Sequence, residues 1–168
     1  NFINEQNPDI LCIQEFSNAA KLDLKIYPYQ YVFMQGEKIK TGQAIFSKYP
    51  IVNEGVVFDE KNNNGAIFAD IEVGKDTLRI YNVHLASMSI EAEAFENYDS
   101  AKQVYKQTLG KLHLGSLKRA QQMNILEEHF SNSPYPVILM GDLNEIPYSN
   151  AYFRLSESLQ NAYELAGR

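Results

Sequence analysis

The stretch Val137-Ile-Leu-Met-Gly-Asp-Leu-Asn-Glu-Ile-Pro147 decides the fold class of this chain. Its first four residues are apolar and lie between Pro136 and Gly141, a pattern typical of a short strand that is buried on both faces. Gly141 allows a tight turn where the strand leaves the sheet. Asp142 and Asn144 are two residues apart, so an extended backbone points both side chains to the same side. A carboxylate and an amide at a strand end suit a hard cation and a phosphate oxygen, although both are also common in ordinary turns.

Two other apolar runs also end in polar residues. Residues 10–13 are all apolar and indicate a central strand, which ends at Gln14 and Glu15. Residues 66–73 and 77–84 predict a β-hairpin, whose second strand ends at Asn82 and His84. Each strand end alone is also consistent with an exposed carboxylate or a structural histidine. Open sheets place ligands at such edges, so the three ends together favour a site for phosphoryl chemistry.

The composition limits the class of protein and the kinds of partner that this chain can have. The chain has 168 residues, of which 45% are hydrophobic and 21% charged, which indicates one globular domain with a real core. The formal net charge of -6 argues against non-specific binding of a polyanion, but not against an enzyme that recruits cations to an acidic cleft. The single cysteine, Cys12, excludes an internal disulfide, and its apolar neighbours predict a buried thiol. Nothing in the sequence fixes the compartment.

The segment from Ser100 to Leu126 is basic. It carries no acidic residue and five basic ones: Lys102, Lys106, Lys111, Lys118 and Arg119. These residues either line a phosphate-binding edge or occupy solvated faces of a helix. We expect a helix over residues 117–130 with Ser116 as its N-cap, and another over residues 148–159.

Four runs of the sequence resemble the motifs of the endonuclease/exonuclease/phosphatase family, the deoxyribonuclease-I-like superfamily. They occur in the family's order and span most of the chain: Asn7-Pro-Asp-Ile-Leu-Cys-Ile-Gln-Glu15, Gly42-Gln-Ala-Ile-Phe-Ser-Lys-Tyr-Pro-Ile51, Tyr81-Asn-Val-His-Leu85 and Gly141-Asp-Leu-Asn-Glu-Ile-Pro147. The resemblance implies an α+β fold, a four-layer α/β/β/α sandwich of two packed, largely antiparallel β-sheets flanked by helices. It implies a single domain over residues 1–168, with the site where the sheet edges meet.

The resemblance also implies a chemistry, the divalent-metal-dependent hydrolysis of a phosphate ester by metal-assisted attack of water. Glu15 matches the family's metal-binding glutamate, and His84 matches the histidine that contacts the scissile phosphate or acts as general acid. Asp142 matches the aspartate that orients the attacking water or holds metal. Asn144 matches the asparagine that holds the phosphate, and we expect Asn82 to be a second substrate contact. These roles fit Mg²⁺ or Mn²⁺, since magnesium prefers one or two carboxylates together with water and phosphate oxygens.

The implied substrate is a phosphate ester, such as nucleic acid, a phospholipid head group or a small phosphodiester, and no stable protein partner is implied. Two family features are missing from the chain, an asparagine before the first helix and a Ser-Asp-His-like run near the end. We therefore expect the domain to be truncated at both ends, a fragment that lacks its terminal strands. The alternative function is a non-catalytic interaction module that retains the fold.

Overall fold

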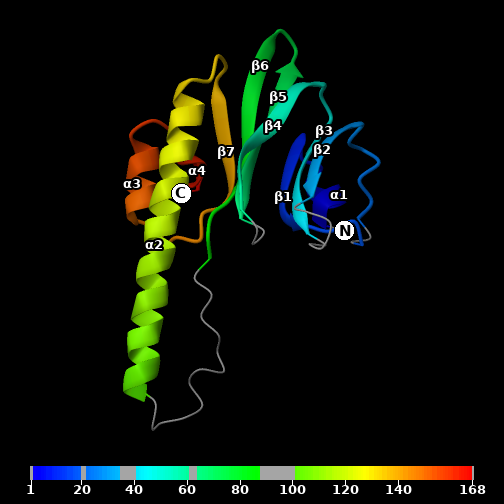
Figure 1. Ribbon diagram of the computed structural model, residues 1–168. Coiled ribbons are helices and arrows are strands. Elements are labelled where there is room, and N and C mark those ends of the chain that lie inside the picture. The colour runs from blue at the N-terminus through cyan, green and yellow to red at the C-terminus, as the bar shows by residue number, and fades with distance from the viewer. Residues whose placement is uncertain (1, 20–21, 35–40, 61–63, 88–100, 168) are drawn as a thin grey trace.

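The computed structural model describes residues 2–19, 22–34, 41–60, 64–87 and 101–167, with side chains placed except at residues 101–108 (Figure 1). Two sheets form its centre. The first has the strand order β1-β3-β2 and the second the order β4-β5-β6-β7, and all neighbours are antiparallel except β6 and β7. The elements are α1 (Phe2–Gln6), β1 (Ile10–Phe16), β2 (Tyr29–Met34), β3 (Gly42–Ser47), β4 (Ile51–Asp59), β5 (Gly65–Val73), β6 (Asp76–His84), α2 (Ala101–Ser131), β7 (Val137–Asp142), α3 (Asn150–Ser156) and α4 (Ala162–Ala166).

The two sheets pack face to face because their strands alternate apolar side chains between two faces. In β3, Ile45 faces the second sheet, whereas Ala44 and Phe46 face outward. The core between the sheets is made of Ile45, Ile67, Ala69, Ile71 and Ile80. Cys12 packs half-buried against this core, and burial raises its pKa to about 12.

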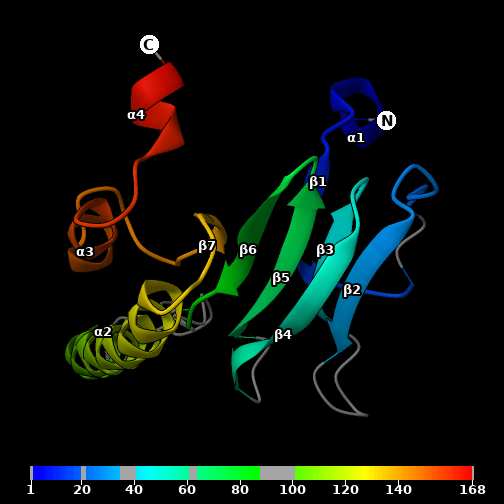
Figure 2. The same ribbon diagram turned by 90° about the horizontal axis from the view of Figure 1, so that it is seen from above.

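Helices cover the outer faces of both sheets. Met123, Leu126 and Phe130 of α2 pack with Ala151 of α3 against the far face of the second sheet. Ile3 of α1 packs against the outer core of the first sheet. Seen from above, α2 and α3 lie on the opposite side of the molecule from α1 (Figure 2). The predicted sandwich of two largely antiparallel sheets flanked by helices is therefore confirmed. No helix among the described residues has the length and apolar character needed to cross a membrane.

Some details of the elements differ from the predictions. Neither β1 nor β7 is central or buried on both faces, because each has one hydrogen-bonded neighbour within the described residues, and Ile138 of β7 is 41% exposed. Ser116 is not an N-cap but lies inside α2, because this helix already begins at Ala101. The helix expected over residues 148–159 is shorter: Ser149 caps α3 by accepting a hydrogen bond from the amide of Tyr152.

A buried ion pair joins β5 and β6 away from the strand ends that carry the site. Arg79 donates from Nε to Asp70 Oδ1 at 2.6 Å and from Nη2 to Oδ2 at 2.8 Å, and Asn53 donates to Asp70 Oδ2 at 2.9 Å. The guanidinium carbon also lies 4.4 Å from the ring centroid of Phe68. Burial raises the pKa of Asp70, but the hydrogen bonds from Arg79 and Asn53 and the charge of Arg79 outweigh it, so the pKa lies below its usual value.

This pair predicts a loss of stability in acid. Because the pKa of Asp70 is lower in the folded state, its contribution is present above the unfolded-state pKa and disappears as the pH falls through the folded-state pKa. We expect Asp70→Asn to lower the free energy of unfolding at pH 7 by about 3–5 kcal/mol, because Arg79 then keeps an uncompensated buried charge. Urea unfolding between pH 7 and pH 2 measures both effects. Asp76→Asn, at the exposed start of β6, is the control, and an equal loss in both variants would contradict the account.

Candidate active site

The three polar strand ends meet at one edge of the two sheets. β6 and β7 are parallel and in register, so that His84 pairs with Asp142. Alternation along β6 places His84 on the same face as Ile80, toward the first sheet. From that sheet, β1 brings Glu15 close, with its Oε1 4.0 Å from Nε2 of His84. Residues far apart in the sequence therefore come together as the strand-end pattern predicts.

Two residues at this edge have unusual backbone conformations. The pairing of β1 with β3 is irregular between Ile13 and Phe16, and Glu15 there has a φ of 53°. Asn144 has a φ of 49°. Positive φ is uncommon outside glycine, and such strain concentrates at functional sites. The bulge leaves the Glu15 side chain 65% exposed while His84 is only 7% exposed, so the carboxylate faces solvent next to a buried imidazole.

Asn82 lies behind His84 and joins the two sheets. Its side chain has no exposed surface. Its Nδ2 donates to the carbonyl oxygens of Ile13 and Ala44, both at 3.0 Å, and its Oδ1 accepts from Nε2 of Gln14 at 2.6 Å. This placement differs from the expected substrate contact, because every polar atom of the side chain is already engaged inside the protein. The sequence pattern placed Asn82 at a strand end, but it did not show that the side-chain amide of Gln14 lies opposite Asn82.

Gly141 brings β7 close to β6 at the point where the site begins. Its φ is 150°, and a Cβ there would lie 1.9 Å from the carbonyl oxygen of Val83. The close approach lets the amide of Leu85 donate to the carbonyl oxygen of Asp142 at 2.9 Å. Glycine is therefore required by space as well as by backbone conformation.

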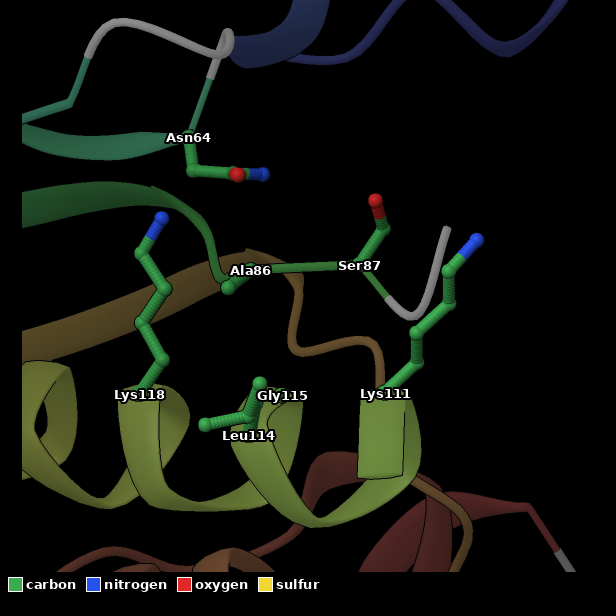
Figure 3. Close-up of a pocket in the computed structure, with 7 residues that line it drawn as sticks. All are labelled: Asn64, Ala86, Ser87, Lys111, Leu114, Gly115 and Lys118. Atoms are coloured by element: carbon green, nitrogen blue, oxygen red, sulfur yellow. The ribbon is translucent and has the colours of Figure 1, made fainter. Parts of the chain in front are cut away.

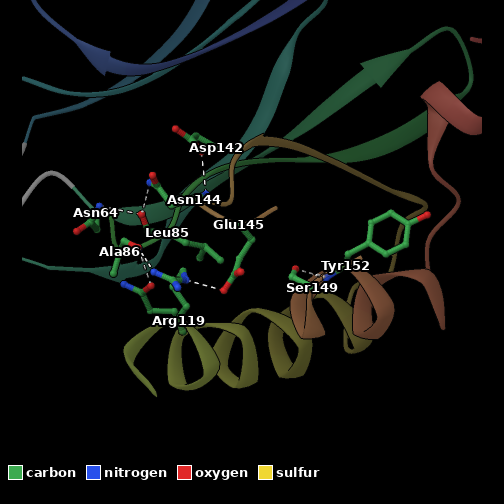
Figure 4. Close-up of polar contacts among 10 residues, drawn as sticks. Asn64, Leu85, Ala86, Arg119, Asp142, Asn144, Glu145, Ser149 and Tyr152 are labelled. Carbon is green, nitrogen blue, oxygen red and sulfur yellow. Dashed lines mark hydrogen bonds and ion pairs between the residues drawn. The ribbon is translucent and has the colours of Figure 1, made fainter. Parts of the chain in front are cut away.

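Asn144 is oriented by two hydrogen bonds (Figure 4). Its backbone amide donates to Oδ1 of Asp142 at 2.8 Å, and its Nδ2 donates to the carbonyl oxygen of Leu85 at 2.9 Å. Leu85 directly follows His84 in the chain. The side chain of Asn144 therefore links its own segment to the segment that carries His84. Among the residues that the structure describes, Leu85 is the acceptor found for Nδ2, which carries a second hydrogen.

The basic segment over residues 100–126 was expected to line a phosphate-binding edge or to occupy solvated faces of a helix. The structure matches neither description in full. Lys118 pairs with Glu60, and Arg119 is buried and pairs with Glu145. Lys111 and Lys118 line a pocket of about 350 Å³, together with Asn64, Ala86, Ser87, Leu114 and Gly115 (Figure 3). The side chains of Lys102 and Lys106 lie outside the described residues.

The donor set suits a hard cation that keeps part of its water shell. Glu15 and Asp142 offer carboxylate oxygens at the exposed edge. Within the described ranges, no three His, Cys, Asp or Glu residues are grouped closely enough to enclose a metal ion. A complete protein cage is not what Mg²⁺ requires, since it is usually held by one or two carboxylates with water and substrate phosphates. The residues present therefore fit magnesium better than zinc, which favours a closed set of protein ligands in structural sites.

Comparison with known proteins decides the family. The family model for the Endonuclease/Exonuclease/phosphatase family matches residues 1–164. This chain belongs to that family. No curated protein matches the sequence.

Several solved structures have a fold similar to that of this chain. Sphingomyelinase C from Streptomyces griseocarneus matches with a TM-score of 0.65 and 20% identity over 90% of this chain and 57% of its own. The human Nocturnin catalytic domain with a bound sulfate anion matches with a TM-score of 0.63 and 20% identity over 97% and 62%. A doubly substituted mutant of beta toxin from Staphylococcus aureus with bound magnesium ions matches with a TM-score of 0.51 and 20% identity over 79% and 49%. The chain thus spans about half to three-fifths of the length of these proteins.

Proposed function

We propose that this family member hydrolyses a phosphate ester with the help of a divalent cation, Mg²⁺ or Mn²⁺. The observation that carries the proposal is the convergence of Glu15, His84, Asp142 and Asn144, from three strand ends, at one exposed edge of the sheets. Family membership supports the same chemistry, as does the bound magnesium in the similar beta toxin. The proposed substrates are phosphodiesters, among which nucleic acid and a phospholipid head group differ only in the groups flanking the phosphate.

Each side chain has a distinct proposed role. Glu15 and Asp142 hold the cation, which when bound polarises the phosphoryl group and offsets its developing charge. Asp142 also orients the attacking water and accepts its proton as the new oxygen–phosphorus bond forms. Asn144 donates the second hydrogen of its side-chain amide to a phosphate oxygen without adding negative charge. His84 contacts the phosphate or protonates the leaving oxygen as the ester bond breaks.

Asn82 has a supporting role in this proposal instead of a contact with substrate. Its hydrogen bonds to Ile13 and Ala44 tie β6 to the first sheet just behind the site. Gln14, which bonds to it, is the residue before Glu15. The Gln14–Asn82 pair therefore sets how far Glu15 lies from His84.

A magnesium titration tests the metal-binding role of Glu15. We expect Glu15→Gln to raise the magnesium concentration needed for half-maximal hydrolysis by about 10–100-fold, because an anionic oxygen ligand becomes a neutral amide. The measurement is the initial rate on bis(p-nitrophenyl) phosphate across a magnesium series.

Glu72→Gln is the matched control for this titration. It makes the same chemical change on an exposed residue at the opposite end of β5 from the strand ends of the site. If the two variants needed the same magnesium concentration, Glu15 would not be a metal ligand.

A further inference from the structure

We infer that Arg119 of α2 is a positioning residue that clamps together the two segments carrying His84 and Asn144. The inference rests on the proposed function, because it explains how those two side chains keep their relative positions. Arg119 is 4% exposed, and its guanidinium bonds to Ala86 and Glu145, so we do not assign it as a substrate contact.

Arg119 bonds to both segments at once (Figure 4). Its Nη1 donates to the carbonyl oxygen of Ala86, two residues after His84, at 3.1 Å. Its Nε donates to Oε1 of Glu145, the residue after Asn144, at 2.6 Å. One guanidinium group on the helix therefore spans the segments after β6 and β7.

Further hydrogen bonds fix the segment after His84 from other directions. Gln122, one turn further along α2, accepts from the amide of Ala86 at 2.9 Å and donates to Glu60 at 2.9 Å. The carbonyl oxygen of Leu85 accepts from Nδ2 of Asn64 and from Nδ2 of Asn144, both at 2.9 Å. Because Asn144 is bonded to this segment, a shift of Leu85 and Ala86 also moves the amide that we assign to the phosphate.

The geometry calls for arginine and not merely a positive charge. The planar guanidinium directs its N–H groups along fixed lines, so that it bonds to the Ala86 carbonyl and the Glu145 carboxylate together. A lysine retains the charge for Glu145 but cannot reproduce this fork. Since a misplacement of about 1 Å at a reacting group lowers the rate by about 100-fold, losing the clamp is expected to reduce turnover more than substrate binding.

Arg119→Lys and Arg119→Met test the inference, with Arg154→Met as the matched control. Arg154 makes an analogous set of bonds between α3 and α2: its Nε donates to Glu127 at 2.8 Å, and its Nη2 donates to Asn124 at 2.7 Å. None of these partners belongs to the segments after β6 or β7. The control thus removes another arginine that bonds to two partners on a different element, and it leaves the proposed clamp intact.

We expect both Arg119 variants to lose about 10–100-fold in kcat on bis(p-nitrophenyl) phosphate, with KM changed by less than about threefold. Rates are measured well below the melting temperature of each variant. Arg154→Met is expected to lower the melting temperature and to keep a kcat within about twofold of wild type. Arg119→Lys keeps the test decisive if Arg119→Met does not fold.

A second readout separates this inference from the proposed function. The side-chain amide resonances of Asn144, assigned in ¹⁵N-correlated NMR spectra with Asn144→Asp, are expected to shift in the Arg119 variants and to stay in place in Arg154→Met. If wild type hydrolyses no phosphoester, the proposed function fails, but the resonances still report on the clamp. Unchanged Asn144 resonances and wild-type kcat in both Arg119 variants would overturn the inference.

Discussion

Asp142→Asn is expected to lower kcat on bis(p-nitrophenyl) phosphate by about 1000-fold, within the range found when a general base is removed. The substitution preserves the shape of the side chain and leaves an oxygen to accept from the amide of Asn144. It removes the negative charge that the proposed mechanism uses to hold the cation and to take the proton of the water. Initial rates at saturating magnesium measure the effect, and circular dichroism shows whether the variant is folded.

Asp76→Asn is the matched control for this comparison. It makes the same substitution at the exposed first residue of β6, at the other end of the strand from His84. Its kcat is expected to stay within about twofold of wild type, as for surface substitutions generally. If Asp142→Asn kept more than a tenth of the wild-type rate, Asp142 would have no direct part in the reaction.

Gly141→Ala is expected to destabilise the protein by about 2–5 kcal/mol, the sum of overpacking and of a β-carbon at unfavourable φ. The added Cβ would lie 1.9 Å from the carbonyl oxygen of Val83, so β7 must move away from β6. That movement breaks the register that places Asp142 beside His84. Urea unfolding followed by circular dichroism measures the loss of stability.

Gly74→Ala separates the two causes of this destabilisation. Gly74 also has a positive φ, 70°, but nothing lies within 4 Å of the Cβ that alanine would add. Its expected loss is therefore only about 1–2 kcal/mol, from backbone strain alone. Equal losses in the two variants would mean that the close approach of β7 to β6 is not needed for stability.

The sequence was sufficient for features that depend on local pattern. Alternating apolar residues predicted the hairpin of β5 and β6, with its turn after Val73, and the structure confirms it. Strand ends were also recognisable, because apolar runs stop at Glu15, His84 and Asp142. The family resemblance then supplied the packing of two sheets, which no local pattern contains.

Features that depend on distant partners could not be predicted in this way. Arg119 lies in a basic segment that was expected to form a solvated helix face or a phosphate-binding edge. Its partners Ala86 and Glu145 are 33 and 26 residues away in the sequence, so the local pattern could not show them. Asn82 looked like a substrate contact because the amide of Gln14, 68 residues earlier, could not be placed opposite it. An apolar run also does not reveal how many neighbours a strand has, so β1 and β7 were expected to be more buried than they are.

The rate of the wild-type protein tests most directly the central claim that this chain is a metal-dependent phosphoesterase. It is the hydrolysis of bis(p-nitrophenyl) phosphate by the folded wild-type protein with magnesium, after EDTA, and after magnesium is added back. The account predicts turnover that stops with EDTA and returns with magnesium, because the carboxylates of Glu15 and Asp142 need the cation to act on a phosphate. Turnover unaffected by EDTA, or none on this or any other phosphoester tested, would contradict it and favour a non-catalytic interaction module.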